Sequence, residues 1–165
     1  MILLYDKNIS KNSLNHELNI EQSHHLYNVL RKRKGFVLTI TDGNGLEWLG
    51  KIYSFKNKKI ELKKINLKIH KNLKNKIHLV IAPAKNIKRM EWMLEKLTEM
   101  GIASITPILC DRSERKSLKT ERLKKIMISA LKQSKQFFLP ELYPMISFES
   151  YIQGIKNPFY IAHCM

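Results

Sequence analysis

Two adjacent histidines and four consecutive cations lie in one short stretch of the sequence, SHHLYNVLRKRKG at residues 23–35. Histidine is a common metal ligand, but His24 and His25 would point about 100° apart on a helix, and no third ligand stands at a suitable spacing. We therefore expect no metal site. Two alternatives remain: one histidine packs or caps while the other faces solvent, or His25 forms a hydrogen bond with a nucleic acid.

The four cations of this stretch have two explanations. They are Arg31, Lys32, Arg33 and Lys34, and the sequence places them at the C-terminal end of a predicted helix. Cations suit that end because they complement the negative pole of the helix macrodipole, although one or two would be enough. A run of four that leads into a strand also presents positive charge on several faces, which suits contacts with phosphates. Both explanations stay open at this point.

A second set of polar side chains follows the predicted strands of the C-terminal half. Lys85 and Arg89 lie near the start of a helix, which is the unfavourable end for cations. Arg112 and Arg115 lie in the loop after the next strand, and Gln133 ends the following helix. In open α/β sheets, ligands collect in the loops that follow the strands. These positions therefore indicate a binding site at that edge of the sheet.

The whole chain is strongly basic. Its 165 residues carry 30 Lys and Arg against 14 Asp and Glu, a formal net charge of +16. Such a charge attracts phosphate backbones, although a lysine-rich composition also produces basic surfaces without a function. The apolar runs are far shorter than the roughly 20 residues that a membrane-spanning helix needs. We therefore expect a cytoplasmic protein that binds no membrane, with Cys110 and Cys164 reduced.

The N-terminal elements must be mainly strands. Over residues 36–69, apolar residues alternate with polar ones on either side of a DGNG turn, which predicts a small barrel with one solvated face. One helix precedes these strands. We expect it to begin after Asn19, a capping residue, and to bury Leu26, Val29 and Leu30 as its apolar stripe.

The C-terminal elements alternate between strand and helix. The run at 77–82 is almost wholly apolar, which predicts a strand covered on both faces, and it is followed by a helix that Gly101 ends. We then expect a strand at 102–110, a helix from about 120 to 138, a short helix and a last strand at 159–164. This alternation predicts an α/β unit with a mainly parallel sheet.

The two patterns divide the chain into two domains. We expect a barrel-like domain over residues 1–70, a basic polar linker at 71–76 and an α/β domain over 77–165. The first 76 residues carry 16 cations and 6 anions, and the remainder carries 14 and 8, so the first part is the more basic. The last predicted strand runs directly to the chain terminus. We therefore expect an important part of the site to lie outside this chain.

Four segments, taken in order, resemble the family of ribosomal RNA small subunit methyltransferase E. They are HHLYNVLRKRKG, DGNG, KRMEWMLEKLTEMGIASITPILCDRS and ERLKKIMISALKQSKQFFLP, and they span nearly all of residues 24–140. The third segment is long and specific, whereas DGNG alone is a common turn. Members of this family methylate N3 of a uridine in 16S ribosomal RNA, with S-adenosylmethionine as the methyl donor.

The resemblance implies a fold and an assembly. The fold would be α+β with two domains, an N-terminal PUA-like β-barrel that binds RNA and a C-terminal SPOUT domain whose trefoil knot holds the cofactor between two subunits. The partners would be 16S ribosomal RNA in the small ribosomal subunit and a second copy of the chain, in a homodimer. The RNA contacts would come from the positions already singled out: His25, Arg31, Lys32, Arg33, Lys34, Lys85 and Arg89.

The resemblance also suggests where the chemistry takes place. Uracil N3 carries a proton at neutral pH, so the site must stabilise the anion and align N3 with the methyl group, and Arg112 and Gln133 would contribute by their positions. Two departures matter. Gln136 stands where the family usually has an Arg, and no counterpart of the family's glycine-rich GPEG loop, which forms the knot and the cofactor pocket, precedes Met165. We therefore expect a C-terminally truncated member that is inactive by itself, with its cofactor-binding residues beyond Met165.

Two other functions stay open. The chain could be a stand-alone RNA-binding module without catalysis, or an α/β enzyme for a small anionic substrate with an incidentally basic surface. The residues encoded after Met165 would separate the methyltransferase from the binding module, because the methyltransferase requires the glycine-rich loop.

Overall fold

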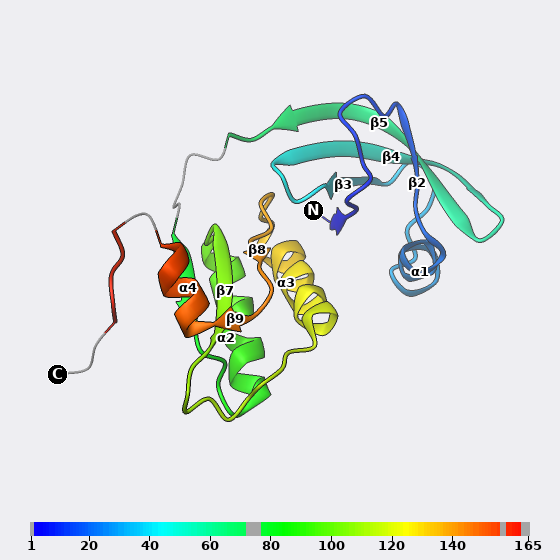
Figure 1. The fold of residues 1–165 in the computed structure, drawn as a ribbon. Helices are drawn as coiled ribbons and strands as arrows, with labels where there is room; N and C mark the ends of the chain where they lie inside the picture. The colour runs from blue at the N-terminus through cyan, green and yellow to red at the C-terminus, as the bar shows by residue number, and fades with distance from the viewer. Residues whose placement is uncertain (1, 72–76, 156–157, 163–165) are drawn as a thin grey trace.

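The computed structural model describes residues 2–71, 77–155 and 158–162, and it contains two sheets (Figure 1). Strands within residues 3–69 form the first sheet, and shorter strands within residues 78–147 form the second. Most of the predicted linker, residues 72–76, lies outside the described residues, as does Cys164. No helix in the described part of the chain has both the length and the apolar character needed to cross a membrane.

The N-terminal sheet is mainly antiparallel. It consists of β1 (Leu3–Tyr5), β2 (Asn15–Glu17), β3 (Val37–Thr41), β4 (Leu46–Lys56) and β5 (Lys59–Ile69), in the order β1-β3-β4-β5-β2. The predicted hairpin is confirmed, because the DGNG turn joins β3 to the antiparallel β4. Within the described residues, β1 and β2 end the sheet without pairing to each other, so closure into a barrel stays a prediction.

The inward side chains of β4 build the core of this sheet. Leu46, Trp48 and Ile52 are buried at alternate or nearly alternate positions, as the period of a strand requires. The indole N–H of Trp48 donates a hydrogen bond to the Ser13 carbonyl at 2.9 Å, so the largest core side chain leaves no polar group unpaired. The other buried members of this cluster are Leu4, Ile9, Leu18, Leu26, Leu38, Ile40, Ile60 and Leu62.

The helix before β3 begins as predicted. Asn19 caps α1 (Ile20–His24), because its side chain accepts a hydrogen bond from the Gln22 backbone N–H at 2.8 Å. From there the chain continues as a π-helix, η1 (His25–Val29). The sequence did not indicate this change of geometry, because the same types of residue form α-helices and π-helices.

The π-helix moves side chains off the buried face. Its i→i+5 hydrogen bonds place more residues in each turn than the 3.6 of an α-helix. Leu26 is buried as predicted, but Val29 is 58% exposed and Leu30 is 38% exposed. The predicted apolar stripe is therefore wrong beyond Leu26.

The second sheet is parallel, as predicted, and alternates with helices. Its strands are β6 (His78–Ile81), β7 (Ser104–Leu109), β8 (Glu141–Leu142) and β9 (Ile146–Ser147), and its helices are α2 (Ile87–Met100), α3 (Thr120–Ser134) and α4 (Phe148–Gly154). The central strand is β7, which pairs with β6 on one side and with β8 and β9 on the other.

Two helices build the second core. Met90 and Leu94 of α2 pack with Leu123 and Met127 of α3 against Ile105 of β7. Both helices therefore cover one face of the sheet. The shorter α4 lies against the other face, as Figure 1 shows.

The ends of the two long helices are set by left-handed residues. Gly101 adopts a φ of 76° after α2, which confirms the predicted stop. Lys135 adopts a φ of 56° and ends α3 at Ser134, so the predicted helix to Phe138 was too long. The residues after Lys135 turn toward the N-terminal sheet instead.

Two strand predictions need correction. Within the described residues β6 pairs only with β7, and its apolar side chains are half-buried, so it is an edge strand rather than one covered on both faces. Residues 159–162 form no strand, and Tyr160 is fully exposed. A strand exists only through hydrogen bonds to a neighbour, which an apolar run cannot specify. Residues 163–164 of that predicted strand lie outside the described residues.

The two sheets meet at the DGNG turn. The Gly45 N–H donates a hydrogen bond to the Phe137 carbonyl at 2.8 Å, and the His70 ring stacks on the Phe137 ring at 4.3 Å. Gly45 has a φ of 95°, and a Cβ there would lie 2.6 Å from Cζ of Phe138 and 2.7 Å from the His70 carbonyl oxygen. Only glycine fits this contact, so the turn sequence also determines how the two halves join.

Candidate functional site

The four consecutive cations form a loop between η1 and β3, which we call the cationic loop (residues 31–34). They follow the helix rather than end it, which corrects the prediction. Arg31 adopts a φ of 53°, a left-handed conformation that costs a residue other than glycine about 1–3 kcal/mol. The Lys32 N–H donates to the Leu26 carbonyl at 2.9 Å and closes the turn. The backbone thus holds these charges in a defined, strained arrangement.

Arg33 folds back onto the end of the helix. Its guanidinium donates hydrogen bonds to the carbonyl oxygens of Tyr27, at 2.7 Å, and Lys32, at 3.1 Å. Its Cζ also lies 4.1 Å from the centroid of the Tyr27 ring. Arg33 therefore neutralises the carbonyl end of η1, which is the first of the two explanations that the sequence left open.

The other cations of the loop do not have this role. Arg31 and Lys34 are exposed, and Lys32 is half-buried. Among the described residues, no acidic side chain forms an ion pair with any residue of the cationic loop. His25 is also exposed, on η1 just before the loop. The loop therefore offers uncompensated positive charge to an anion.

The second cationic group lies where the parallel strands end. It is carried by the loops after β6 and β7, residues 82–86 and 110–119, which we call the carboxyl-edge loops. Lys85 pairs with Glu114 at 2.8 Å. Arg115 donates to the carbonyl oxygens of Ala84, at 3.2 Å, and Lys85, at 2.6 Å. Arg115 therefore ties one loop to the other instead of presenting its charge to a ligand.

Arg112 lies at the rim of two open cavities. One, of about 340 Å³, is lined by Cys110, Asp111, Arg112, Phe148 and Glu149, and the other, of about 290 Å³, by Ala82, Pro83, Lys85, Cys110, Arg112, Ser113 and Glu114. The Arg112 side chain is exposed, and no ion pair engages it among the described residues. Its position suits an anion that binds at the sheet edge.

Arg89 lies on the first turn of α2, outside these two cavities. It is exposed, and it lines an apolar cavity of about 490 Å³ together with Trp92 and Met93. The predicted RNA-binding positions thus fall into two groups, one on the cationic loop beside α1 and one near the ends of β6 and β7 (Figure 1).

Gln133 is not brought close to Arg112. It is exposed on the last turn of α3, whereas Arg112 lies in the loop that leads into the first turn. A helix of 15 residues is about 22 Å long at 1.5 Å per residue. The two side chains therefore lie toward opposite ends of the α/β unit within one chain.

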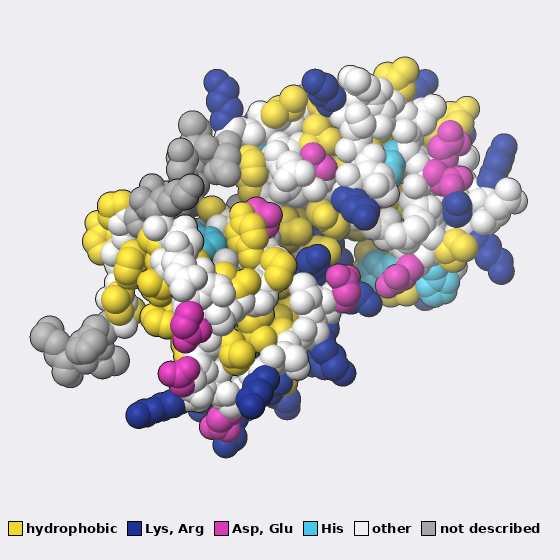
Figure 2. Space-filling model, viewed as in Figure 1, with side chains coloured by type: hydrophobic (Ala, Val, Ile, Leu, Met, Phe, Trp, Pro, Cys, Tyr) yellow, Lys and Arg dark blue, Asp and Glu magenta, His cyan; other side chains and the backbone are white. Residues whose placement is uncertain are grey.

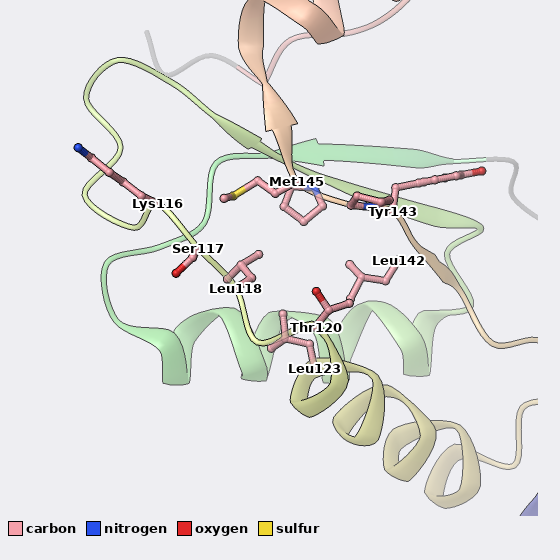
Figure 3. Close-up of a pocket in the computed structure, with 10 residues that line it drawn as sticks. Lys116, Ser117, Leu118, Thr120, Leu123, Leu142, Tyr143 and Met145 are labelled. Carbon is pink, nitrogen blue, oxygen red and sulfur yellow. The ribbon is translucent and has the colours of Figure 1, made fainter.

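A further cavity, of about 250 Å³, lies between the loop before α3 and the segment after β8 (Figure 3). The side chains that converge on it are apolar, among them Leu118, Leu142 and Met145, while those of Lys116 and Tyr143 point away. The cavity offers few polar groups for chemistry. We therefore place the candidate site at the carboxyl-edge loops and the cationic loop.

Two titrating groups with raised pKa values lie in surface contacts and mark no further site. The hydrogen bond that the Tyr143 hydroxyl donates to Glu141 raises the pKa of Tyr143, and hydrogen bonds to Glu95 and Glu99 raise the pKa of Lys96. Both are surface contacts. No group of three or more His, Cys, Asp or Glu in the described ranges is placed to hold a metal ion.

Sequence reasoning missed the aromatic residues beside the cationic loop. Tyr27 comes from η1, and Tyr53 and Phe55 come from β4. The segment KIYSFK at residues 51–56 carried the signal, because aromatic side chains interleaved with cations are typical of nucleic-acid-binding surfaces.

Family comparisons agree with the two-part structure. A family model described as an RNA methyltransferase domain matches residues 71–164, and one described as an RNA methyltransferase PUA domain matches residues 18–65. Ribosomal RNA small subunit methyltransferase E of Synechocystis sp. is 26% identical over 147 residues, which cover 88% of this chain and 48% of the relative. The chain thus spans about half the length of that relative.

Solved structures resemble the chain over most of its length. A probable rRNA methyltransferase from Porphyromonas gingivalis is 34% identical, with a TM-score of 0.83 over 92% of this chain and 63% of that protein. A putative methyltransferase from Legionella pneumophila, in complex with the bound cofactor SAM, is 25% identical, with a TM-score of 0.75 over 94% of this chain and 66% of that protein. SAM is S-adenosylmethionine.

Proposed function

Because the chain belongs to the ribosomal RNA small subunit methyltransferase E family of RNA methyltransferases, we propose that it takes part in the methylation of N3 of a uridine in 16S ribosomal RNA. The observation that carries the proposal is the match of two family domains, a PUA domain followed by an RNA methyltransferase domain. Each of the two matched halves presents exposed cations. The methyl donor is S-adenosylmethionine, and the reaction takes place in the cytoplasm.

The described residues do not by themselves form a fitting site for S-adenosylmethionine. A drug-sized ligand needs a pocket that buries most of its surface, and adenine needs apolar walls. The two cavities around Arg112 are open, and charged side chains make up half of the residues that line them, so they do not enclose an adenine ring in apolar walls. We therefore assign the cofactor site to residues that correspond to the unmatched part of the relatives, and we expect this chain to be inactive by itself.

The residues of this chain have binding and orienting roles in the proposal. The cationic loop and His25 hold the RNA on the N-terminal sheet, which closes as a PUA-like barrel. Lys85 and Arg112 of the carboxyl-edge loops receive it together with Arg89 on the first turn of α2, and Arg112 stabilises the uracil anion. Gln133 shares that site only if the second subunit of a homodimer supplies it, because one chain keeps it far from Arg112. The α/β sheet then forms part of a SPOUT trefoil knot.

A chimera tests the proposed reaction. The chain is joined at its C-terminal end to the residues of the Synechocystis relative that follow the matched segment. The chimera is incubated with small ribosomal subunits and radiolabelled S-adenosylmethionine. We expect label in 16S RNA as 3-methyluridine, identified by mass spectrometry of the nucleosides, and no label with the chain alone. A chimera that binds both substrates but methylates nothing, or another base, would contradict the proposal.

Two solution measurements test the assembly and the cofactor assignment. Calorimetry should detect no binding of S-adenosylmethionine to the chain alone, and micromolar binding would place the pocket within the present residues. Light scattering of the chimera should give the mass of a dimer. A monomeric mass at the concentration of the assay would contradict a site to which two subunits contribute.

The second candidate function is an RNA-binding module without catalysis. The cationic loop favours it, because its exposed cations can bind RNA without a methyl donor. Tight binding of small subunits by both the chain and the chimera, with no methyl transfer by either, would select this function.

A further inference from the structure

Three of the four cations in the cationic loop lie over aromatic rings. Nζ of Lys32 is 4.6 Å from the centroid of the Phe36 ring, and Nζ of Lys34 is 5.5 Å from that of Tyr53. The third is Arg33, over Tyr27. Basic side chains interleaved with aromatic rings are common where proteins bind single-stranded nucleic acid. The cationic loop is therefore part of a composite basic and aromatic surface.

Tyr27 is the middle layer of a stack. The ring of Phe55 lies parallel to it, with centroids 4.1 Å apart and planes 6° apart, and Cζ of Arg33 also lies 4.1 Å from the Tyr27 centroid. A ring and a guanidinium cannot occupy the same face at these distances, so they lie on opposite faces of Tyr27. Phe55 is 38% exposed, and the Tyr27 ring covers only one of its two faces. The stack therefore ends in an aromatic surface open to solvent.

Tyr53 lies on a β-bulge of β4, two residues before Phe55. The β4–β5 register shifts between Ile52 and Ser54, so Tyr53 has no partner on β5. Bulges redirect side chains, and Tyr53 is 54% exposed with Lys34 over its ring. An exposed tyrosine of this kind is available for a flat ligand.

We propose that Tyr53 and Phe55 form a stacking platform for unpaired RNA bases, with Arg31 and Lys34 as the phosphate contacts that flank it. The nature of this RNA, a ribosomal segment, rests on the proposed function. Single-stranded RNA fits because each base offers a flat π-face for the rings and each phosphate a charge for cations that have no acidic partner among the described residues. A double helix would present only its phosphates, since its bases are stacked and paired.

Substitutions on the platform separate base stacking from phosphate binding. The probe is a short single-stranded oligouridine that carries one 2-aminopurine, whose fluorescence falls when it stacks. We expect Tyr53→Ala and Phe55→Leu each to weaken binding about 5- to 100-fold, the range for one lost base–aromatic stack, with an unchanged salt dependence. We expect Lys34→Ala to lower the slope of affinity against salt by about one contact and to keep the quenching.

Ile65→Ala is the matched control for Tyr53→Ala. Ile65 is also exposed. It lies at the other register shift between β4 and β5, because Leu49 pairs with Asn66 and Gly50 with Lys64, which leaves Ile65 without a partner on β4. It should bind the probe like the unsubstituted chain. Tyr53→Phe, which keeps the ring, should also bind normally, and equal melting temperatures would show that each variant is folded.

Three results would overturn the platform. The first is normal affinity and quenching in Tyr53→Ala and Phe55→Leu. The second is a loss of binding to duplex RNA in these variants that equals their loss of binding to the single-stranded probe. The third is displacement of the probe by a polyglutamate peptide as readily as by unlabelled oligouridine. The last result would indicate a surface for acidic proteins. These assays use no methyl donor, so a chimera that fails to methylate while stacking persists would refute the proposed reaction and leave the platform intact.

Discussion

The cationic loop and the carboxyl-edge loops are both basic, but their cations have different partners. In the cationic loop, Lys32, Arg33 and Lys34 lie over aromatic rings. In the carboxyl-edge loops, Lys85 pairs with Glu114, and Arg115 bonds backbone carbonyls. An aromatic ring leaves most of a cation's charge available, whereas a carboxylate cancels it. The first surface is therefore the stronger attractor of phosphate.

This difference assigns separate tasks to the two halves of the molecule. RNA affinity should depend mainly on the N-terminal half, and the reaction should depend on the C-terminal half. Figure 2 shows basic side chains spread over the visible face of both halves, so the distribution of cations alone does not reveal this division. Five substitutions, grouped in four predictions, probe the two halves and their joint, from the largest expected effect to the smallest.

Arg112→Ala should have the largest effect, on the reaction rather than on binding. In the chimera, the barrier to methyl transfer should rise by about 2–4 kcal/mol, the scale of one lost charge-stabilising donor. The measurement is the single-turnover rate with small subunits. Lys116→Ala, in the same loop with a side chain that points away from the nearby cavity, should leave the rate unchanged. Equal rates for both variants would show that Arg112 does not stabilise the transition state of methyl transfer.

Gly45→Ala should weaken the connection between the two halves. The new Cβ would meet Phe138 and the His70 carbonyl, and the positive φ is unfavourable for alanine, so we expect a loss of about 1–3 kcal/mol in unfolding free energy. Urea denaturation followed by circular dichroism measures it. Gly154→Ala is the control, because a Cβ there meets nothing within 4 Å. Equal stability of the two variants would show that the joint contributes little.

The two arginines of the cationic loop should behave differently. Arg33→Ala removes hydrogen bonds to two carbonyl oxygens and should cost about 1 kcal/mol of stability. Arg31→Gly relieves the positive φ, so stability should not fall, but the salt slope of RNA binding should drop by about one contact. Thermal melting and salt titrations measure the two effects. The same response from both variants would mean that the loop acts as one unit.

Glu114→Ala should have the smallest effect. Its ion pair with Lys85 is exposed, and such pairs contribute about 0–1 kcal/mol. The melting temperature should hardly change. The affinity for RNA should rise slightly, because Glu114 no longer competes with the phosphates for Lys85. A large destabilisation would mean that the ion pair, and not Arg115, holds the two loops together.

Local sequence signals predicted the elements that depend on neighbours within one turn. The Asn19 cap, the DGNG turn and the Gly101 stop were read correctly because each acts over a few residues. The alternation of apolar and polar residues over 36–69 predicted the strands themselves, since the period of a strand is also local. The family resemblance rests on such segments, and the comparisons bear it out.

Tertiary contacts decided which of the candidate residues are available. The sequence by itself determined that four cations would stand together near strands, but not that Arg33 would be bound to the end of η1 while Arg31 stays free. Nor could it show that α3 separates Arg112 from Gln133. Tyr27 meets Phe55, and Gly45 meets Phe137, only after distant segments have packed. Periodicity and capping encode local conformation, whereas the partner of a charge is set by the packing of the whole chain.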